Sequence, residues 1–176
     1  MTTTAQTPRT MIPAPQRPAP VRPTAREEDD GHRGHRNGSR NWNQGWSELI
    51  AAVRESGQYP TTAEAERVTR IVLSALGGHV TSDERVALAR ALPREAARVI
   101  ASQIPATRPQ SAQEFVDTVA SRIEGATHAT ARWDVSSVLG VLPNLIGDDL
   151  TDRILSQLPP GYALLFGRAE LASRTS

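Results

Sequence analysis

The sequence contains no cysteine, no lysine and no long apolar run. Without cysteine the chain can form neither a disulfide nor a thiolate metal site, and it lacks a cysteine nucleophile. No segment approaches the roughly 18 apolar residues of a membrane span, and the first residues lack the apolar core of a secretion signal. We therefore expect a cytoplasmic protein that makes no contact with a membrane. All 20 basic residues are arginine, which, with the many alanines, glycines and prolines, indicates a bacterium with a GC-rich genome.

Apolar side chains are scarce in the first 45 residues, which contain six of the 13 prolines. The large apolar residues before Trp42 are Met1, Met11, Ile12 and Val21. Such a segment buries too little apolar surface to offset the entropy lost on ordering it. We predict that residues 1–45 form a disordered tail rich in proline and arginine. The tail has seven arginines and four acids, whereas the rest of the chain has 13 arginines and 15 acids, so affinity for anions is expected in the tail.

The remainder of the chain contains an internal repeat. A shift of 66 residues aligns segment 49–102 with segment 115–168 without a gap, and identical residues coincide at Val72 and Val138, Leu73 and Leu139, and Leu76 and Leu142. Apolar residues recur at helical spacing in both copies, and no stretch alternates as a strand would. A copy of ~55 residues buries too little surface to be stable alone. The prediction is an all-α fold: two tandem four-helix repeats packed into one pseudo-twofold helical domain, preceded by the disordered N-terminal tail.

Local signals set the expected boundaries. Repeat 1 covers 46–103, a linker covers 104–110, repeat 2 covers 111–170, and residues 171–176 fray. Capping-box patterns predict helix starts at Thr61, Thr81 and Ser111. Gly77-Gly78 is expected to end a helix in the left-handed conformation, and Pro143 to end the helix that Thr127 starts.

The repeated pattern is similar to that of a known family. Val72/Leu76/Leu92-Pro93 recurs as Val138/Leu142/Leu158-Pro159, and the chain closes on Leu158-Pro159-Pro160-Gly161-Tyr162-Ala163-Leu164-Leu165-Phe166. With these motifs, roughly residues 46–168 resemble the bacterial domain-of-unknown-function family 2267. The resemblance implies a bacterial, all-helical tandem repeat, and it brings no catalytic or binding residue with it.

We assign no catalytic, cofactor-binding or metal-binding residue. The sequence has no Gly-x-Ser-x-Gly elbow and no glycine-rich phosphate loop. His79 lies close in sequence to Asp83 and would suit acid–base catalysis, although a loop histidine beside a capping acid is commoner. Asp148, Asp149 and Asp152 would suit a hard cation, but acids in a first helical turn are favoured by the helix dipole.

Aromatic residues and tail arginines are the candidate contacts. Trp133 replaces Arg67 of the first copy at a position off the apolar stripe, and Tyr162 has no aromatic counterpart in that copy. We expect Trp133 and Tyr162 to contact a partner. Flexible arginines beside an aromatic residue suit sequence-tolerant nucleic-acid binding, for which the candidates are Arg33, Arg36, Arg40 and Trp42.

Three functions follow, in order of preference. The first is a non-enzymatic helical protein-interaction module, with the tail as a flexible docking arm and another protein as partner. The second is a nucleic-acid-associated protein that binds through the tail arginines. The third is an enzyme with a pocket between the repeats. A homodimer formed by exchange of repeats about the 104–110 hinge is a further alternative.

Overall fold

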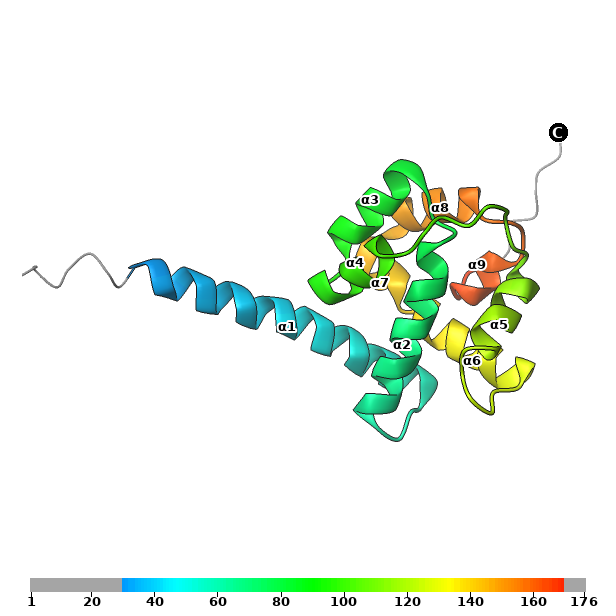
Figure 1. The fold of residues 1–176 in the computed structure, drawn as a ribbon, viewed down its shortest axis with the longest axis horizontal. Coiled ribbons are helices and arrows are strands. Elements are labelled where there is room, and N and C mark those ends of the chain that lie inside the picture. Colours follow the sequence, from blue (N-terminus) through cyan, green and yellow to red (C-terminus); the bar gives the residue numbers. More distant parts are fainter. Residues whose placement is uncertain (1–29, 170–176) are drawn as a thin grey trace, which may run out of the picture.

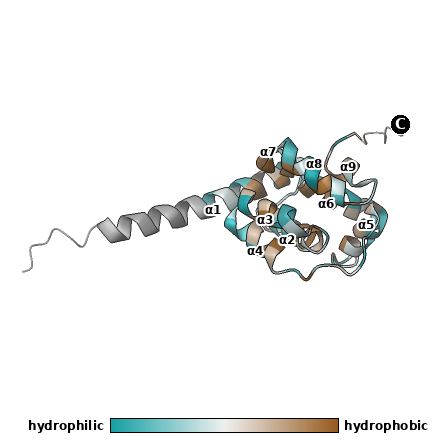
Figure 2. Cartoon of the chain, turned by 90° about the horizontal axis from the view of Figure 1, so that it is seen from above, coloured by the Kyte–Doolittle hydropathy of each residue, from teal (hydrophilic) through white to brown (hydrophobic). Residues whose placement is uncertain are grey.

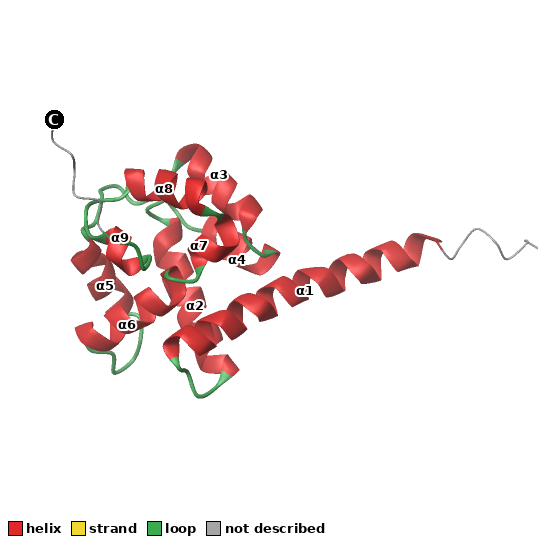
Figure 3. Ribbon diagram, turned by 180° about the vertical axis from the view of Figure 1, so that it is seen from behind, coloured by secondary structure: helices red, strands yellow, loops and turns green. Residues whose placement is uncertain are grey.

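The computed structural model describes residues 30–169, with side chains from Gln44 onward. In chain order, the helices are α1 (Asp30–Gly57), α2 (Thr62–Gly77), α3 (Ser82–Ala91), α4 (Arg94–Ala101), α5 (Ala112–Ala120), α6 (His128–Leu139), α7 (Leu142–Ile146), α8 (Asp148–Gln157) and α9 (Tyr162–Leu165). No strand occurs within residues 30–169 (Figure 3). The predicted all-α class is therefore confirmed.

Helices from both predicted repeats share one core (Figure 1). α1 packs against α6, α2 packs against α5 and α6, and α3 packs against α7 and α8. The aligned pairs Val72-Leu73 and Val138-Leu139 are fully buried. α3 and α8 begin and end 66 residues apart, as the alignment requires. The two predicted repeats thus pack on each other within this chain, while the twofold relation in space stays a prediction.

Each helix buries one side. Apolar and polar residues alternate along the helices in Figure 2, as expected where one face packs on a core and the other meets solvent. Phe115 of α5 is fully buried at the centre of an aromatic group. Its ring centroid lies 5.9 Å from that of His79 and 5.4 Å from that of Tyr162, in edge and tilted arrangements. These contacts connect the end of α2 with α5 and α9.

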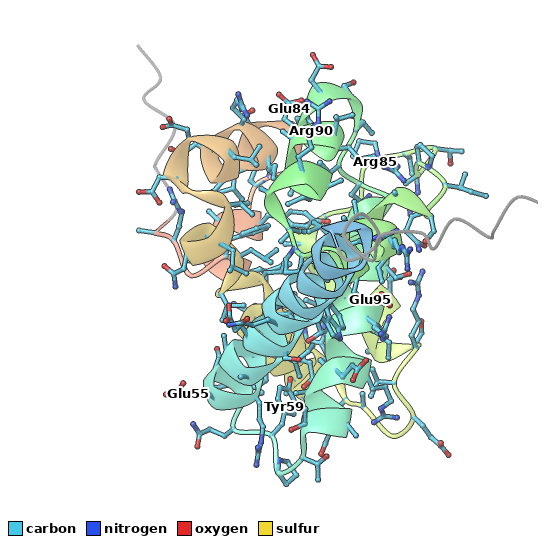
Figure 4. All side chains as sticks on the ribbon, turned by 90° about the vertical axis from the view of Figure 1, so that its left-hand side faces the viewer. Glu55, Tyr59, Glu84, Arg85, Arg90 and Glu95 are labelled. Atoms are coloured by element: carbon cyan, nitrogen blue, oxygen red, sulfur yellow. The ribbon has the colours of Figure 1, made fainter. Side chains whose placement is uncertain are left out.

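Arg70 of α2 joins three helices. Its guanidinium carbon lies 4.9 Å from the ring centroid of Trp46 in α1. It pairs with Glu66 at 2.8 Å within α2 and with Glu95 of α4 at 2.9 Å. Figure 4, which looks along α1, shows Glu95 beside that helix. The group fixes α1 across α2 and α4.

α1 is longer than the sequence predicted. It begins at Asp30, so residues 30–45, which we assigned to the disordered tail, are helical in the structure. No proline interrupts the chain between Pro23 and Pro60, and each residue added to an existing helix gains a hydrogen bond without a new nucleation cost. The packed turns after Trp46 can thus propagate towards the N-terminus. Residues 1–29 lie outside the described residues.

Three helix ends differ from the prediction. Gly77 and Gly78 are not left-handed: Gly78 has φ −76°, and its N–H donates to the carbonyls of Ala75 and Leu76. Thr81 makes no side-chain cap; its N–H donates to the side chain of Gln157 instead. α6 ends at Leu139, and Pro143 lies in the first turn of the separate helix α7, where its missing N–H costs little. The caps at Thr61 and Ser111 are confirmed, the latter as a complete capping box.

Candidate functional site: the Trp133 groove

The connection between α1 and α2 is held tightly at one end of the molecule. Arg54 donates hydrogen bonds to the carbonyls of Tyr59 at 3.2 Å and Pro60 at 3.1 Å. A β-carbon at Gly57 would lie 2.2 Å from Cε2 of Tyr59, so the ring can pack there only against glycine. The connection therefore fixes the position of the Tyr59 ring, labelled in Figure 4.

Tyr59 is paired with a carboxylate of the second repeat. Its hydroxyl donates to Asp134 of α6 at 2.6 Å, and the tyrosine is buried. Burial, and then the hydrogen bond and charge of Asp134, raise the pKa of Tyr59 far above its ordinary value. Burial also raises the pKa of Asp134, and the nearby charge of Glu64 adds to this, while Tyr59 and Arg67 oppose it. The pair joins α6 to the α1–α2 connection.

Trp133, the residue before Asp134, is exposed yet held in place. It is 56% exposed, as the sequence predicted for a position off the apolar stripe. Its indole N–H donates to the carbonyl of Gly57 at 3.1 Å. The indole therefore presents a large, partly apolar surface in one fixed orientation.

A groove of about 480 Å³ runs beside this indole, and we call it the Trp133 groove. Its lining comes from α2, α6 and the α5–α6 connection. The apolar or small lining residues are Ile123, Gly125, Ala126, Ala129 and Trp133. Its charged residues are Glu64, Arg67, Glu124 and Asp134, an excess of acids. The groove thus combines apolar and small residues with an excess of acidic ones.

The raised pKa of Asp134 makes a testable contribution to stability. Because the pKa of Asp134 is raised above its ordinary value of 3.8, the folded chain holds the carboxyl proton of Asp134 more tightly than the unfolded chain does. The contribution of Asp134 to the free energy of unfolding therefore falls as pH rises through the folded pKa. Asp134→Asn keeps an oxygen that can accept from Tyr59 but removes the titration. Relative to wild type, the variant should gain stability between pH 4 and pH 7 in urea unfolding.

Tyr59→Phe serves as the companion variant. This variant removes the hydroxyl whose hydrogen bond lowers the pKa of Asp134, so the pKa of Asp134 should rise further. The free energy of unfolding should then fall by more between pH 4 and pH 7 than it does in the wild type. A difference between Asp134→Asn and wild type that stays constant from pH 4 to pH 7 would contradict the assignment of a desolvated carboxylate.

Tyr162 is buried, whereas the sequence analysis placed it among the surface contacts. It is 1% exposed, and its hydroxyl donates to the carbonyl of Gln110 at 3.1 Å. Burial raises its pKa well above the ordinary value. Gly161, with φ +96°, begins the short helix α9 and turns the ring inward against Phe115. Tyr162 is thus part of the core.

His79 does not form a catalytic couple with Asp83. Asp83 is absent from the groups that influence the His79 imidazole, which are Phe115, Gln110 and Arg122. The imidazole is half-buried against Phe115, and burial lowers its pKa, with Gln110 opposing the shift and Arg122 adding to it. The geometry therefore gives no support to the enzyme hypothesis at this position.

The remaining predicted contacts lie on α1 in its N-terminal part. Arg33, Arg36, Arg40 and Trp42 fall in the helix, but their side chains lie outside the described residues. Positions 33, 36 and 40 are spaced by three and four residues, which places them on one side of the helix. The structure thus places these four positions on one helix, and their role in binding stays a prediction.

A second groove, of about 460 Å³, lies where α6 meets α5 and α9. Nδ1 of His128 lies 2.6 Å from a carboxylate oxygen of Asp117 beside it, and Leu164 is 51% exposed at its edge. The hydroxyl of Ser111, which also lines it, accepts from the N–H of Glu114 as a helix cap.

Among the described side chains, those of residues 44–169, no group of three or more histidines or carboxylates is placed to hold a metal ion. Asp148 and Asp152 both pair with Arg168 instead, the latter at 2.7 Å. None of the helices within residues 30–169 has the length and apolar character that crossing a membrane requires.

The sequence reasoning missed Tyr59 and Asp134, although the repeat contains a signal for the latter. Asp134 aligns with Val68 of the first copy, which is buried in the core. A carboxylate at the position of a core valine needs a compensating partner. Tyr59 lies in a short connection without periodicity, so no local pattern identified that partner.

Comparison with known proteins identifies a family for this chain. The model of one protein family, described as Uncharacterized conserved protein (DUF2267), matches residues 46–165. This range contains predicted repeat 1, residues 111–165 of predicted repeat 2 and the whole Trp133 groove. No curated protein matches the chain.

Proposed function

We propose that this chain, which belongs to the DUF2267 family of uncharacterised conserved proteins, is a non-enzymatic helical protein-interaction module that binds its partner in the Trp133 groove. The observation that carries the proposal is the exposed indole of Trp133, which lines the groove and is fixed by its hydrogen bond to the carbonyl of Gly57. Tryptophan is among the residues that most often dominate binding energy. A side chain already fixed in place loses little entropy on binding.

The charged residues of the groove define the chemistry of the partner. Glu64, Glu124 and Asp134 outnumber Arg67, so the field over the groove favours a cationic ligand and repels phosphates. Gly125 and Ala129 have small side chains or none, so a chain bound in the groove can approach their backbone closely. An extended segment with apolar residues between arginines or lysines fits these properties.

Removing the indole tests the proposal. Trp133→Ala should weaken partner binding by about 2 kcal/mol, roughly 30-fold, while unfolding changes by only about 1 kcal/mol because the ring is largely exposed. The measurement is affinity capture from the native host after nuclease treatment, comparing wild type, Trp133→Ala and Leu164→Ala. Leu164 is similarly exposed but belongs to the second groove, which makes it the matched control.

The outcomes separate the candidate functions. Proteins retained by wild type and Leu164→Ala but lost with Trp133→Ala support the groove. Proteins retained by all three variants would argue against it. Partners that disappear on nuclease treatment would favour nucleic-acid association through positions 33, 36 and 40 of α1, for which the spacing along one side of the helix is the supporting observation. The arginine-only composition supports a bacterial origin for either activity.

A further inference from the structure

From the shape and charge of the Trp133 groove, we infer that the chain's own residues 9–17 occupy it in the free protein. The inference rests on the proposed function, because it takes the same groove as a site for extended basic segments. The occupant is the segment Arg9-Thr-Met-Ile-Pro-Ala-Pro-Gln-Arg17 of the same molecule. Binding of an external partner then requires its release.

Charge complementarity selects this part of the chain. Residues 8–26 contain Arg9, Arg17, Arg22 and Arg26 and no acid, whereas residues 27–30 are all acidic. The groove has three acids and one arginine. A guanidinium beside Glu64, Glu124 or Asp134 forms charge-assisted hydrogen bonds, and it favours the ionised form of Asp134, which burial alone disfavours.

The pattern of residues 9–17 also matches the groove. Met11 and Ile12 are the largest apolar residues between the two arginines. Together they supply an apolar centre that can pack against the apolar lining residues Ile123, Ala126 and Trp133. Pro13 and Pro15 favour an extended polyproline conformation, so the segment loses less entropy on docking than an ordinary chain would.

The lengths agree as well. α1 has 28 residues, which span about 40 Å at ~1.5 Å per residue. The groove begins at the C-terminal end of this helix, where Gly57 accepts the indole hydrogen bond of Trp133. Thirteen residue steps separate Arg17 from Asp30, and in an extended polyproline conformation they also span about 40 Å at ~3.1 Å each. A chain that turns back at Asp30 therefore reaches the groove at Arg17.

The absence of cysteine makes the test direct. In the full chain, Ala14→Cys provides the only thiol, which can carry a nitroxide spin label. We expect the label to broaden the NMR signals of Gly125, Ala129 and the Trp133 indole. The amides of Asp152 and Arg153 on α8 should keep their intensity and serve as the internal control. Unbroadened groove signals would overturn the inference.

Two further samples establish specificity and connectivity. Arg9→Gln combined with Arg17→Gln should restore most of the groove signal intensity, and so should Glu64→Gln combined with Glu124→Gln. Broadening that survives both pairs of substitutions would overturn the electrostatic account. A mixture of spin-labelled unenriched chains with ¹⁵N-enriched unlabelled chains should show no broadening. Broadening in that mixture would overturn docking within one molecule and identify a second copy as the source.

These results are distinguishable from a failure of the proposed function. If the spin label leaves the groove unbroadened while Trp133→Ala still loses host proteins, the inference is wrong and the interaction module stands. If the groove is broadened but Trp133→Ala loses no host protein, the segment docks in a groove that external partners do not use.

Discussion

Replacing Phe115 with alanine is expected to lower the free energy of unfolding by about 3–5 kcal/mol. The phenylalanine is fully buried, and its ring contacts His79 at the end of α2 and Tyr162 of α9. Truncation removes apolar surface from the core and leaves a cavity between helices that already pack against each other on several sides. Because both repeats contribute to this core, the variant should lose stability throughout residues 46–168, in a single unfolding transition.

Urea unfolding followed by circular dichroism measures this loss. Leu164→Ala is the matched control, because it also shortens a large apolar side chain but at a position 51% exposed, and it should cost less than about 1 kcal/mol. Two separate transitions in the Phe115→Ala variant, with only one of them shifted, would contradict a shared core.

Gly77→Val is expected to cost about 3 kcal/mol or more, at the upper end of the range for overpacking. A β-carbon at position 77 would lie 2.9 Å from the carbonyl oxygen of Ile100 and 3.1 Å from its Cα. Both are backbone atoms of α4, so no side-chain rotation can relieve the overlap. The substitution therefore pushes α4 away from α2 and loosens the packing of Ile100, which is fully buried.

The neighbouring glycine provides the control. A β-carbon at Gly78 would meet its nearest atom, the carbonyl oxygen of Ile104, at 3.4 Å, an ordinary contact, and its φ is −76°. Gly78→Ala should therefore be neutral or stabilising by a few tenths of a kcal/mol, because alanine restricts the unfolded chain. If urea unfolding showed that Gly77→Val and Gly78→Ala lower the free energy of unfolding equally, the need for glycine would come from the conformation at the helix end and not from close packing.

The two glycines also show how far local reasoning extended. Sequence patterns located the end of α2 within a residue, because a glycine pair after an apolar stripe is a strong stop signal. They attributed the stop to left-handed backbone, which the structure does not contain at either glycine. The requirement at Gly77 comes from Ile100, 23 positions further along the chain, and a local pattern carries no information on that contact.

At the Trp133 groove, too, the sequence predicted some features and the tertiary structure decided others. The alignment of the repeats identified Trp133 as a residue off the core stripe, and the structure exposes it. The same reasoning offered Tyr162 as a contact residue, yet the α9 turn buries it against Phe115. Both are aromatic residues without a counterpart in the first copy. Trp133 lies at the surface and Tyr162 in the core because the folded backbone directs one side chain outward and the other inward.

The sequence by itself determined the helical class, the recurrence of core positions at a spacing of 66 residues, and most helix starts. These properties depend on the period of apolar residues and on capping side chains, which act within one or two turns of chain. The tertiary structure alone decided the pairing of Tyr59 with Asp134, the indole bond to Gly57 and the acidic groove between them. Those contacts join residues about 75 positions apart, and their energy exists only once packing of the two repeats has brought the groups together.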